Sequence, residues 1–374
     1  MSCKLIHPEQ YLNLLLSDTP LLDVRAEIEF ARGAFPSAVN HPILNTAERE
    51  QVGLCYKAHG QDAAIRLGQD LVSGAVKERR IADWVEFAKK NPQGALYCFR
   101  GGLRSKISQE WLKEAGIHYP RIAGGYKSLR NYLLESLTQI CATTEFLILS
   151  GRTGTGKTRF LQEFDNSLDL EHFARHRGSA FGGMLEEQPA FIDFENAVII
   201  RLLKLVQAKA NPILVEDEGQ NIGRVFIPKI LYEKMSVSPI VVLETPLEMR
   251  VQAILNEYVI QRYHDFGGEA SSSSFENLAN SLLTPVEKIT KRLGLQRTAA
   301  VRENILLALD EQKRSADFSA HKNWIRQLLE DYYDPLYDRL LQKKSQLVRF
   351  QGPAEGVKDL LTARFVVTQK KTVA

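Results

Sequence analysis

The stretch FLILSGRTGTGKT, residues 146–158, decides the fold of this chain. Its first five residues predict a buried strand, the next eight match the phosphate-loop pattern GxxxxGK[ST] without deviation, and a helix is expected from Lys157 onward. Backbone N–H groups of such a loop cradle a di- or triphosphate, the lysine neutralises its outer oxygens, and the following hydroxyl can hold Mg²⁺. The diphosphate-binding residues are therefore expected to be Gly151, Gly154, Gly156, Lys157 and Thr158.

Further apolar runs downstream predict the sheet that surrounds this loop. Residues 213–215 and 240–243 are continuous apolar runs, as a covered parallel sheet requires. The first run continues into Glu216-Asp217-Glu218, a Walker-B type strand end at which Glu216 or Asp217 could bind a metal. An acidic turn after a strand is usually only solvated, so this interpretation depends on the phosphate loop upstream. The loop itself accepts ATP, GTP or an isoprenyl diphosphate equally well.

Arginines and helices complete the expected second half of the chain. Two arginine sites could close over the phosphates: Arg177, in a basic glycine-containing connection, and Arg250, in the first turns of a later helix. Phosphate or RNA contact is favoured for Arg177, whose alternative is a basic loop in solvent, and it is not favoured for Arg250, whose alternative is a surface arginine. Thr245-Pro246-Leu247-Glu248 predicts a capping box with proline at the first helical position and a helix to about residue 263. Residues 267–277 are expected to form a flexible loop, and the pattern is helical from there to about residue 345.

The amino-acid composition limits the classes of protein to which this chain can belong. A chain of 374 residues with 44% hydrophobic and 25% charged residues is expected to form two or more globular domains. Its apolar runs are no longer than five residues, and the first twenty residues contain no apolar core of a signal peptide. We therefore expect a cytoplasmic protein without a membrane-spanning segment.

Charge is unevenly distributed along the chain. The whole chain has a net charge of +3, but residues 281–374 contain 17 basic and 11 acidic residues, a net charge of +6. Such a basic segment is compatible with a polyanionic partner, although a solvated helical surface is the commoner explanation.

Cysteine 98 stands in a different setting from the other three cysteines. It follows a predicted strand at residues 96–99 and precedes Arg100-Gly101-Gly102-Leu103-Arg104, after which a helix is expected. Loop amides, a helix N-terminus and two guanidinium groups stabilise a thiolate and attract an anionic substrate. Cys98, Arg100 and Arg104 are therefore the candidate catalytic residues; Cys3, Cys55 and Cys141 lack such neighbours and zinc-type spacing, and we expect them to be structural or incidental.

Three motifs in the first 143 residues resemble the rhodanese domain. They are Asp23-Val24-Arg25 with residues 29–40, the Cys98 loop, and Gly124-Gly125-Tyr126. The resemblance implies that Cys98 accepts sulfur or selenium. The five residues between Cys98 and Arg104 are one more than the common sulfurtransferase loop has, and they give the CxxxxxR spacing of related phosphatases, so attack on a phosphoester stays open.

The order of the two halves, together with the Cys98 loop, residues 176–182 and residues 215–218, resembles the bacterial tRNA 2-selenouridine synthase family. This implies an α/β protein with a rhodanese-like domain at 1–143, a P-loop NTPase-like parallel-sheet domain at 144–280 and a mainly helical, basic region at 281–374. It also implies conversion of wobble 2-thiouridine in lysine, glutamate and glutamine tRNAs to 2-selenouridine. Geranyl diphosphate would first alkylate the sulfur, and selenium from selenophosphate would then replace the geranylthio group.

The implied ligands follow from the same resemblance. They are the anticodon region of the tRNA, geranyl diphosphate, selenophosphate, Mg²⁺ at the phosphate loop and a selenophosphate-supplying enzyme. Two other classes of function remain open: an ATP-dependent sulfurtransferase or kinase with a rhodanese domain, and a non-catalytic tRNA-binding protein. The intact Cys98 loop argues against the second, because a binding protein would not need the thiol.

Overall fold

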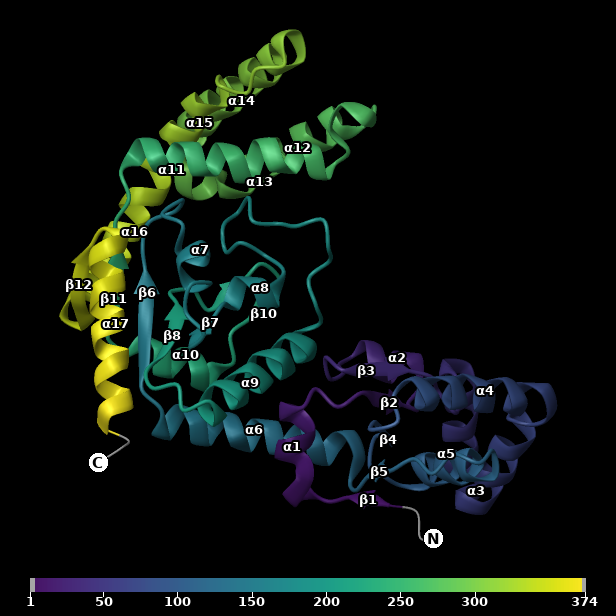
Figure 1. Ribbon diagram of the computed structural model, residues 1–374. Coiled ribbons are helices and arrows are strands. Elements are labelled where there is room, and N and C mark those ends of the chain that lie inside the picture. Colours follow the sequence, from purple (N-terminus) through teal and green to yellow (C-terminus); the bar gives the residue numbers. More distant parts are fainter. Residues whose placement is uncertain (1–3, 372–374) are drawn as a thin grey trace. The chain divides into compact units, whose positions relative to one another are not determined.

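The computed structural model describes residues 4–371 and divides into two compact units, each built on a parallel sheet (Figure 1). The first unit comprises Met1–Ala142 together with Pro189–Lys204, and the second comprises Thr143–Gln188 and Leu205–Ala374. The chain is therefore a mixed α/β protein, in agreement with the class expected from the sequence.

The first unit contains a five-stranded sheet in the order β1-β5-β4-β2-β3, in which all pairs are parallel. Its strands are β1 (Leu5–Ile6), β2 (Leu21–Asp23), β3 (Ala38–Asn40), β4 (Ala95–Tyr97) and β5 (Arg121–Ile122). The central strands β2 and β4 are buried along their whole length, which explains their continuous apolar sequences. Cys98 lies immediately after β4, at the carboxyl edge of the sheet.

Six helices lie between and after the strands of this sheet. They are α1 (Tyr11–Leu16), α2 (Glu27–Ala31), α3 (Thr46–Leu71), α4 (Gly74–Lys90), α5 (Leu103–Glu114) and α6 (Gly125–Thr143). The helix expected after the Gly-Gly loop is α5, and it ends before Gly116, whose positive φ of 83° suits a residue that terminates a helix. The helical pattern up to residue 143 is α6.

A segment remote in sequence completes the first unit. The beginning of α9 (Phe191–Gln207) packs here, where Asp193 accepts a hydrogen bond from the Ala34 amide (2.6 Å) and Asn196 donates one to the Ala34 carbonyl (2.6 Å). Arg130 of α6 pairs with Glu195 and Asn196 of the same segment. Residues 189–204 were expected in the P-loop domain, because these long-range contacts leave no local signal in the sequence.

The second unit contains a parallel sheet in the order β12-β11-β6-β8-β7. Its strands are β6 (Phe146–Ser150), β7 (Ser167–Leu168), β8 (Ile213–Glu216), β11 (Ile240–Leu243) and β12 (Val348–Gly352), and a separate hairpin joins β9 (Asn221–Ile222) to β10 (Val225–Phe226). The three strands predicted from apolar runs are β6, β8 and β11, side by side at the centre. Because β8 is next to β6, the acidic turn after β8 ends beside the phosphate loop.

The sheet of the second unit is flanked by α7 (Lys157–Leu161), α8 (Leu170–Ala174), α10 (Lys229–Ser236) and α17 (Ala354–Lys371). A group of helices with its own buried core packs at the carboxyl end of this sheet (Figure 1). It contains α11 (Leu247–Ile254), α12 (Gln261–Asp265), α13 (Ser274–Leu293), α14 (Leu295–Ser315), α15 (His321–Leu328) and α16 (Asp334–Lys343), with π-helical turns at Leu255–Ile260 (η2) and Leu329–Tyr333 (η4).

Three expectations differ from this fold. Residues 281–374 are not a separate region, since β12 is an edge strand of the P-loop sheet and the rest belongs to the same unit. The capping box at Thr245 is absent: the N-cap residue of α11 is Pro246, which provides no side-chain cap, and Thr245 Oγ1 donates instead to the Thr155 carbonyl (3.2 Å). The loop expected at residues 267–277 is shorter, because α13 already begins at Ser274.

No helix within residues 4–371 combines the length and the apolar character that crossing a membrane would require. Cys3 lies outside the described residues, and no disulfide joins Cys55, Cys98 or Cys141 to one another.

Candidate functional site

The phosphate loop joins the end of β6 to the start of α7. Gly154 and Gly156 have positive φ values of 84° and 81°, a conformation that glycine adopts without strain, and Gly156 begins the helix. Lys157 Nζ donates a hydrogen bond to the Gly151 carbonyl (3.0 Å), so its ammonium group lies across the loop. The five residues expected to bind a diphosphate therefore lie together in one loop.

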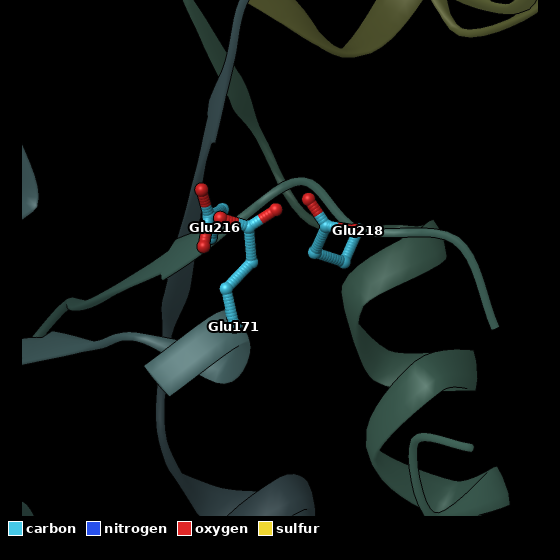
Figure 2. Close-up of side chains that lie close together, drawn as sticks. All are labelled: Glu171, Glu216 and Glu218. Atoms are coloured by element: carbon cyan, nitrogen blue, oxygen red, sulfur yellow. The ribbon is translucent and has the colours of Figure 1, made fainter. Parts of the chain in front are cut away.

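Three glutamates converge beside Thr158 at the carboxyl edge of the sheet. Glu171 comes from α8, Glu216 ends β8 and Glu218 follows it, and Figure 2 shows their carboxyl groups gathered at one point. One oxygen of each lies within 4.8 Å of the others. The Thr158 hydroxyl lies 3.3 Å from Glu171 Oε2 and 3.4 Å from Glu216 Oε1, so the phosphate loop and the carboxylates form one site, which we call the acid cluster.

Burial and mutual repulsion make the acid cluster hard to ionise. Burial first, and then the Glu218 carboxylate, raise the pKa of Glu171 to about 8. Burial and Glu216 raise the pKa of Glu218 to about 8, and burial and Glu171 raise the pKa of the almost fully buried Glu216 well above its usual range. Lys157 opposes these effects but does not outweigh them. A cation at this point would remove the repulsion.

The residues of the acid cluster fit a divalent metal ion. Carboxylate and hydroxyl oxygens are the ligands that Mg²⁺ prefers, and Glu216 Oε2 is buried with no hydrogen-bond partner in the part of the chain that the structure describes. The sequence pointed to Glu216 or Asp217 as metal ligand. Asp217 instead accepts hydrogen bonds from Ser150 (2.5 Å) and Lys344 (3.2 Å), so its carboxylate is already satisfied.

Glu171 and Glu218 are site residues that the sequence did not single out. Glu218 belongs to the acidic turn after β8, so its position next to Glu216 and Asp217 could have marked it as a candidate metal ligand. Glu171 lies on a five-residue helix 13 positions after Thr158, and nothing in the local sequence distinguishes it from a surface glutamate.

Arg250 has a role that the sequence missed. Only 2% of the residue is exposed, and its guanidinium forms a two-pronged ion pair with Asp334 of α16 (2.7 and 2.8 Å) and donates to the Thr153 carbonyl (3.2 Å). The alternative of a surface arginine is therefore wrong, because the helix that carries Arg250 packs against the phosphate loop. Arg250 positions that loop rather than facing solvent.

The basic connection at residues 175–183 covers the acid cluster. A Cβ atom added to Gly178 would lie 2.5 Å from Glu218 Oε2 and 2.7 Å from Glu171 Oε1, so the backbone of this loop rests on the carboxylates. Arg177 lies over the Tyr258 ring (5.4 Å) and reaches the Glu257 carbonyl (3.5 Å). Arg177 thus borders the phosphate site, and its contact with phosphate or RNA stays a prediction.

A second site surrounds Cys98 in the first unit. The thiol borders a pocket of about 590 Å³ whose lining includes five arginines. They are Arg25, Arg32, Arg49, Arg100 and Arg104. The Cys98 residue is 3% exposed, and its Sγ lies 3.2 Å from the Ser105 hydroxyl at the start of α5. The arrangement suits an anion held next to a thiol.

The arginines of this pocket are not equally available. Arg104 is held by Glu29 (2.6 and 3.2 Å), which also pairs with Arg49 (3.0 Å). Burial lowers the pKa of Arg104, but Glu29 outweighs this effect and the net pKa is raised. Arg32 and Arg100 form no salt bridge within the described residues, and Arg100 is exposed. Arg100 is therefore the freer anion-binding group of the two expected from the sequence.

Comparison with known proteins identifies the family. Residues 144–367 match the family model described as "tRNA 2-selenouridine synthase AAA domain". The tRNA 2-selenouridine synthase of Hahella chejuensis is 48% identical over 353 residues, which cover 94% of this chain and 93% of that protein. The chain belongs to the tRNA 2-selenouridine synthase family.

Other members of the tRNA 2-selenouridine synthase family are similar over the same length. The proteins of Bordetella petrii and Marinobacter nauticus are 49% and 46% identical over 349 residues, covering 93% and 92% of this chain and 93% and 95% of their own lengths. The similarity therefore extends over both units.

Proposed function

We propose that this protein converts 2-thiouridine at the wobble position of lysine, glutamate and glutamine tRNAs to 2-selenouridine in two steps. Membership of the family supports the overall conversion. The observation that carries the two-step form is the presence of two separate anion sites, a phosphate loop with an acid cluster in one unit and a thiol among arginines in the other.

The first step is alkylation of the thiocarbonyl sulfur by geranyl diphosphate. The soft sulfur attacks the allylic carbon, a C–S bond forms, the C–O bond breaks and diphosphate leaves. Negative charge develops on the departing oxygens, where the phosphate-loop amides and Lys157 stabilise it. Mg²⁺ held by Thr158 and the acid cluster would supply further positive charge to the same oxygens.

The second step is replacement of the geranylthio group by selenium. Alkylation turns the C=S group into a leaving group, so the C2 carbon becomes open to the selenium of selenophosphate. Selenium attacks C2, geranylthiolate departs, and hydrolysis of the Se–P bond releases phosphate. Arg100 and Arg104 would hold the selenophosphate anion, and Cys98 would position its selenium for attack on C2.

The tRNA substrate requires a cationic surface. Lys288, Lys291 and Arg292 occur at helical spacing on α13 and are all exposed; we call them the α13 basic face. We propose that this face contacts tRNA phosphates. We also propose that an enzyme that makes selenophosphate supplies this substrate to the protein.

Mass spectrometry of tRNA nucleosides tests the function directly. Purified protein is incubated with 2-thiolated tRNA, geranyl diphosphate and selenophosphate, each also omitted in turn. We expect S-geranyl-2-thiouridine without selenophosphate and 2-selenouridine with it. Turnover of ATP stimulated by tRNA, with no nucleoside product from geranyl diphosphate, would instead favour an ATP-dependent sulfurtransferase or kinase.

A further inference from the structure

The pocket beside Cys98 is larger than its expected anion requires. Its volume of about 590 Å³ lies in the range of about 300–1,000 Å³ that is typical of sites for a whole organic ligand. Every residue of its lining belongs to the first unit, including Ile192 of α9. Selenophosphate beside Cys98 would therefore fill only part of the pocket and leave room for the base that it attacks.

Three of the five arginines that line this pocket are already paired with carboxylates. Arg25 forms a buried ion pair with Asp23 (2.6 Å). Glu29 pairs with Arg49 (3.0 Å) and with Arg104 (2.6 Å). These three guanidinium groups are therefore committed to the protein, and a ligand has to use the other two first.

Arg32 and Arg100 remain available to a ligand. Both are exposed, and within residues 4–371 neither side chain forms a hydrogen bond or an ion pair. They come from different elements: Arg100 belongs to the same loop as Cys98, whereas Arg32 ends α2. An unpaired guanidinium in a pocket can bind two adjacent acceptor atoms of a ligand at once.

The backbone that carries Arg32 is fixed, although its side chain is free. The Gly33 amide donates to the Phe30 carbonyl (2.9 Å), and the Gly33 carbonyl accepts from Arg25 (2.9 Å). A Cβ atom added to Gly33 would lie 2.5 Å from Cγ2 of the pocket residue Ile192, so this turn packs tightly against α9. Arg32 therefore reaches the pocket from a rigid turn, as a group that recognises one edge of a ligand requires.

Alkylation of the sulfur changes the hydrogen-bonding edge of the uracil ring. In 2-thiouridine and in 2-selenouridine, N3 carries a proton and acts as a donor. In S-geranyl-2-thiouridine, N3 has lost this proton, so N3 and the neighbouring O4 are two adjacent acceptors. A guanidinium group donates two N–H bonds to such a pair, as arginine does to O6 and N7 of guanine. Only the alkylated base therefore matches an arginine at this edge.

We propose that Arg32 binds N3 and O4 of the S-geranylated base and thereby selects this intermediate over both 2-thiouridine and 2-selenouridine. The inference rests on the proposed function, because it assumes that selenium is introduced beside Cys98. When selenium attacks C2, the π electrons of the C2=N3 bond move to N3 and O4, and the double bond re-forms as geranylthiolate leaves. Arg32 stabilises the negative charge between these two events, and Arg100 holds the selenophosphate.

Steady-state conversion of tRNA that already contains S-geranyl-2-thiouridine tests this role. Arg32→Gln should lower kcat about 100-fold, because a preorganised donor is lost where charge develops, and should leave KM for selenophosphate within about twofold. Arg32→Lys should recover at most about a tenth of the wild-type rate, because an ammonium group keeps the charge without the fork. Arg79→Gln is the matched control and should match wild type, since Arg79 is an exposed arginine of the same unit that does not line the pocket. A normal kcat for Arg32→Gln, a raised KM for selenophosphate instead, or full recovery in Arg32→Lys would overturn the proposal.

Binding of short anticodon stem–loops tests recognition of N3 in the wild-type protein, without the terpene chain. One stem–loop contains S-methyl-2-thiouridine at the wobble position, and in the other N3 of that base is replaced by C–H. Wild-type protein should bind the first about tenfold tighter, and Arg32→Gln should bind both equally. Equal affinities of the wild-type protein for the two stem–loops would contradict the proposal.

The wild-type protein also separates failure of this inference from failure of the proposed function. If wild type converts S-geranyl-2-thiouridine to 2-selenouridine and Arg32→Gln does so at the same rate, the inference is wrong and the proposed function stands. If wild type forms no 2-selenouridine from geranylated tRNA and selenophosphate, the two-step function is wrong and the inference fails with it.

Discussion

Replacing Glu218 by glutamine should weaken the pH dependence of stability in the second unit. Glu218 and Glu171 each have a pKa raised from an ordinary value of about 4.5 to about 8. Between these values the folded protein keeps protons that the unfolded chain has lost. The free energy of unfolding of the metal-free protein is therefore greatest below about pH 4.5 and falls as pH rises through about 8.

The size of this effect follows from the pKa difference. A difference of about 3.5 in one carboxyl group corresponds to at most about 5 kcal/mol. Because solvent reaches part of both side chains and the two groups titrate together, we expect about 1–3 kcal/mol. Between pH 5.5 and pH 8.5, Glu218→Gln should therefore gain this amount of stability relative to wild type, since the amide never ionises.

Hydrogen exchange followed by mass spectrometry measures this for the second unit alone. Peptides from β6 and β8 report its free energy of opening, which a two-unit unfolding curve would blend with that of the first unit. Glu276→Gln, at an exposed position on α13, serves as control. Parallel pH profiles for wild type and Glu218→Gln would refute the reasoning, because the carboxyl would then not be held protonated.

The Mg²⁺ affinity of the same two proteins is the second measurement. Mg²⁺ requires the ionised carboxylates, so its affinity for wild type should rise with pH up to about 8 and its binding should release protons. Glu218→Gln should lose at least about tenfold in affinity. Mg²⁺ that binds the variant as tightly as wild type would exclude Glu218 as a ligand.

Three further outcomes follow from the contacts described above. Lys157→Ala should lower geranylation of thiolated tRNA at least about 100-fold in a nucleoside assay, since the contact lies where negative charge develops; a wild-type rate would exclude the phosphate loop from the chemistry. Charge reversal of the α13 basic face should flatten the dependence of tRNA affinity on salt, and an unchanged slope would locate the tRNA elsewhere. Arg250→Ala should destabilise the second unit by about 3–5 kcal/mol in the same exchange experiment, because it leaves Asp334 and the Thr153 carbonyl unpaired. Arg152→Ala is the control and should cost under about 1 kcal/mol, because the ion pair that it breaks with Asp338 has side chains that are 43% and 50% exposed.

Features that depend on a short stretch of sequence could be predicted. The phosphate loop, the strands β6, β8 and β11, and the turn from β4 through Cys98 into α5 are each specified by neighbouring residues. Apolar runs and glycine spacing therefore located the phosphate loop and the cysteine loop correctly. The rhodanese-like character of the first unit stays a prediction from its motifs.

Features that depend on contacts between remote segments could not be predicted. Glu171 joins Glu216 only because α8 follows the neighbouring strand β7, and Arg250 becomes buried only because α16 packs against it. The edge strand β12 follows a long helical region, and its alternating Val348-Arg349-Phe350-Gln351 pattern was the one local signal available. Long-range pairing, rather than residue type, decides these positions.

The nucleoside content of tRNA treated with Cys98→Ala tests the central claim of two separate sites most directly. This variant removes the thiol of the arginine pocket and leaves Lys157, Thr158 and the acid cluster unchanged. Cys141→Ala, at a second buried cysteine of the same unit, is the matched control and should make 2-selenouridine like wild type. We expect Cys98→Ala to accumulate S-geranyl-2-thiouridine and to form no 2-selenouridine. Normal 2-selenouridine formation by Cys98→Ala, or loss of geranylation in a folded variant, would contradict the division of the two steps between the two sites.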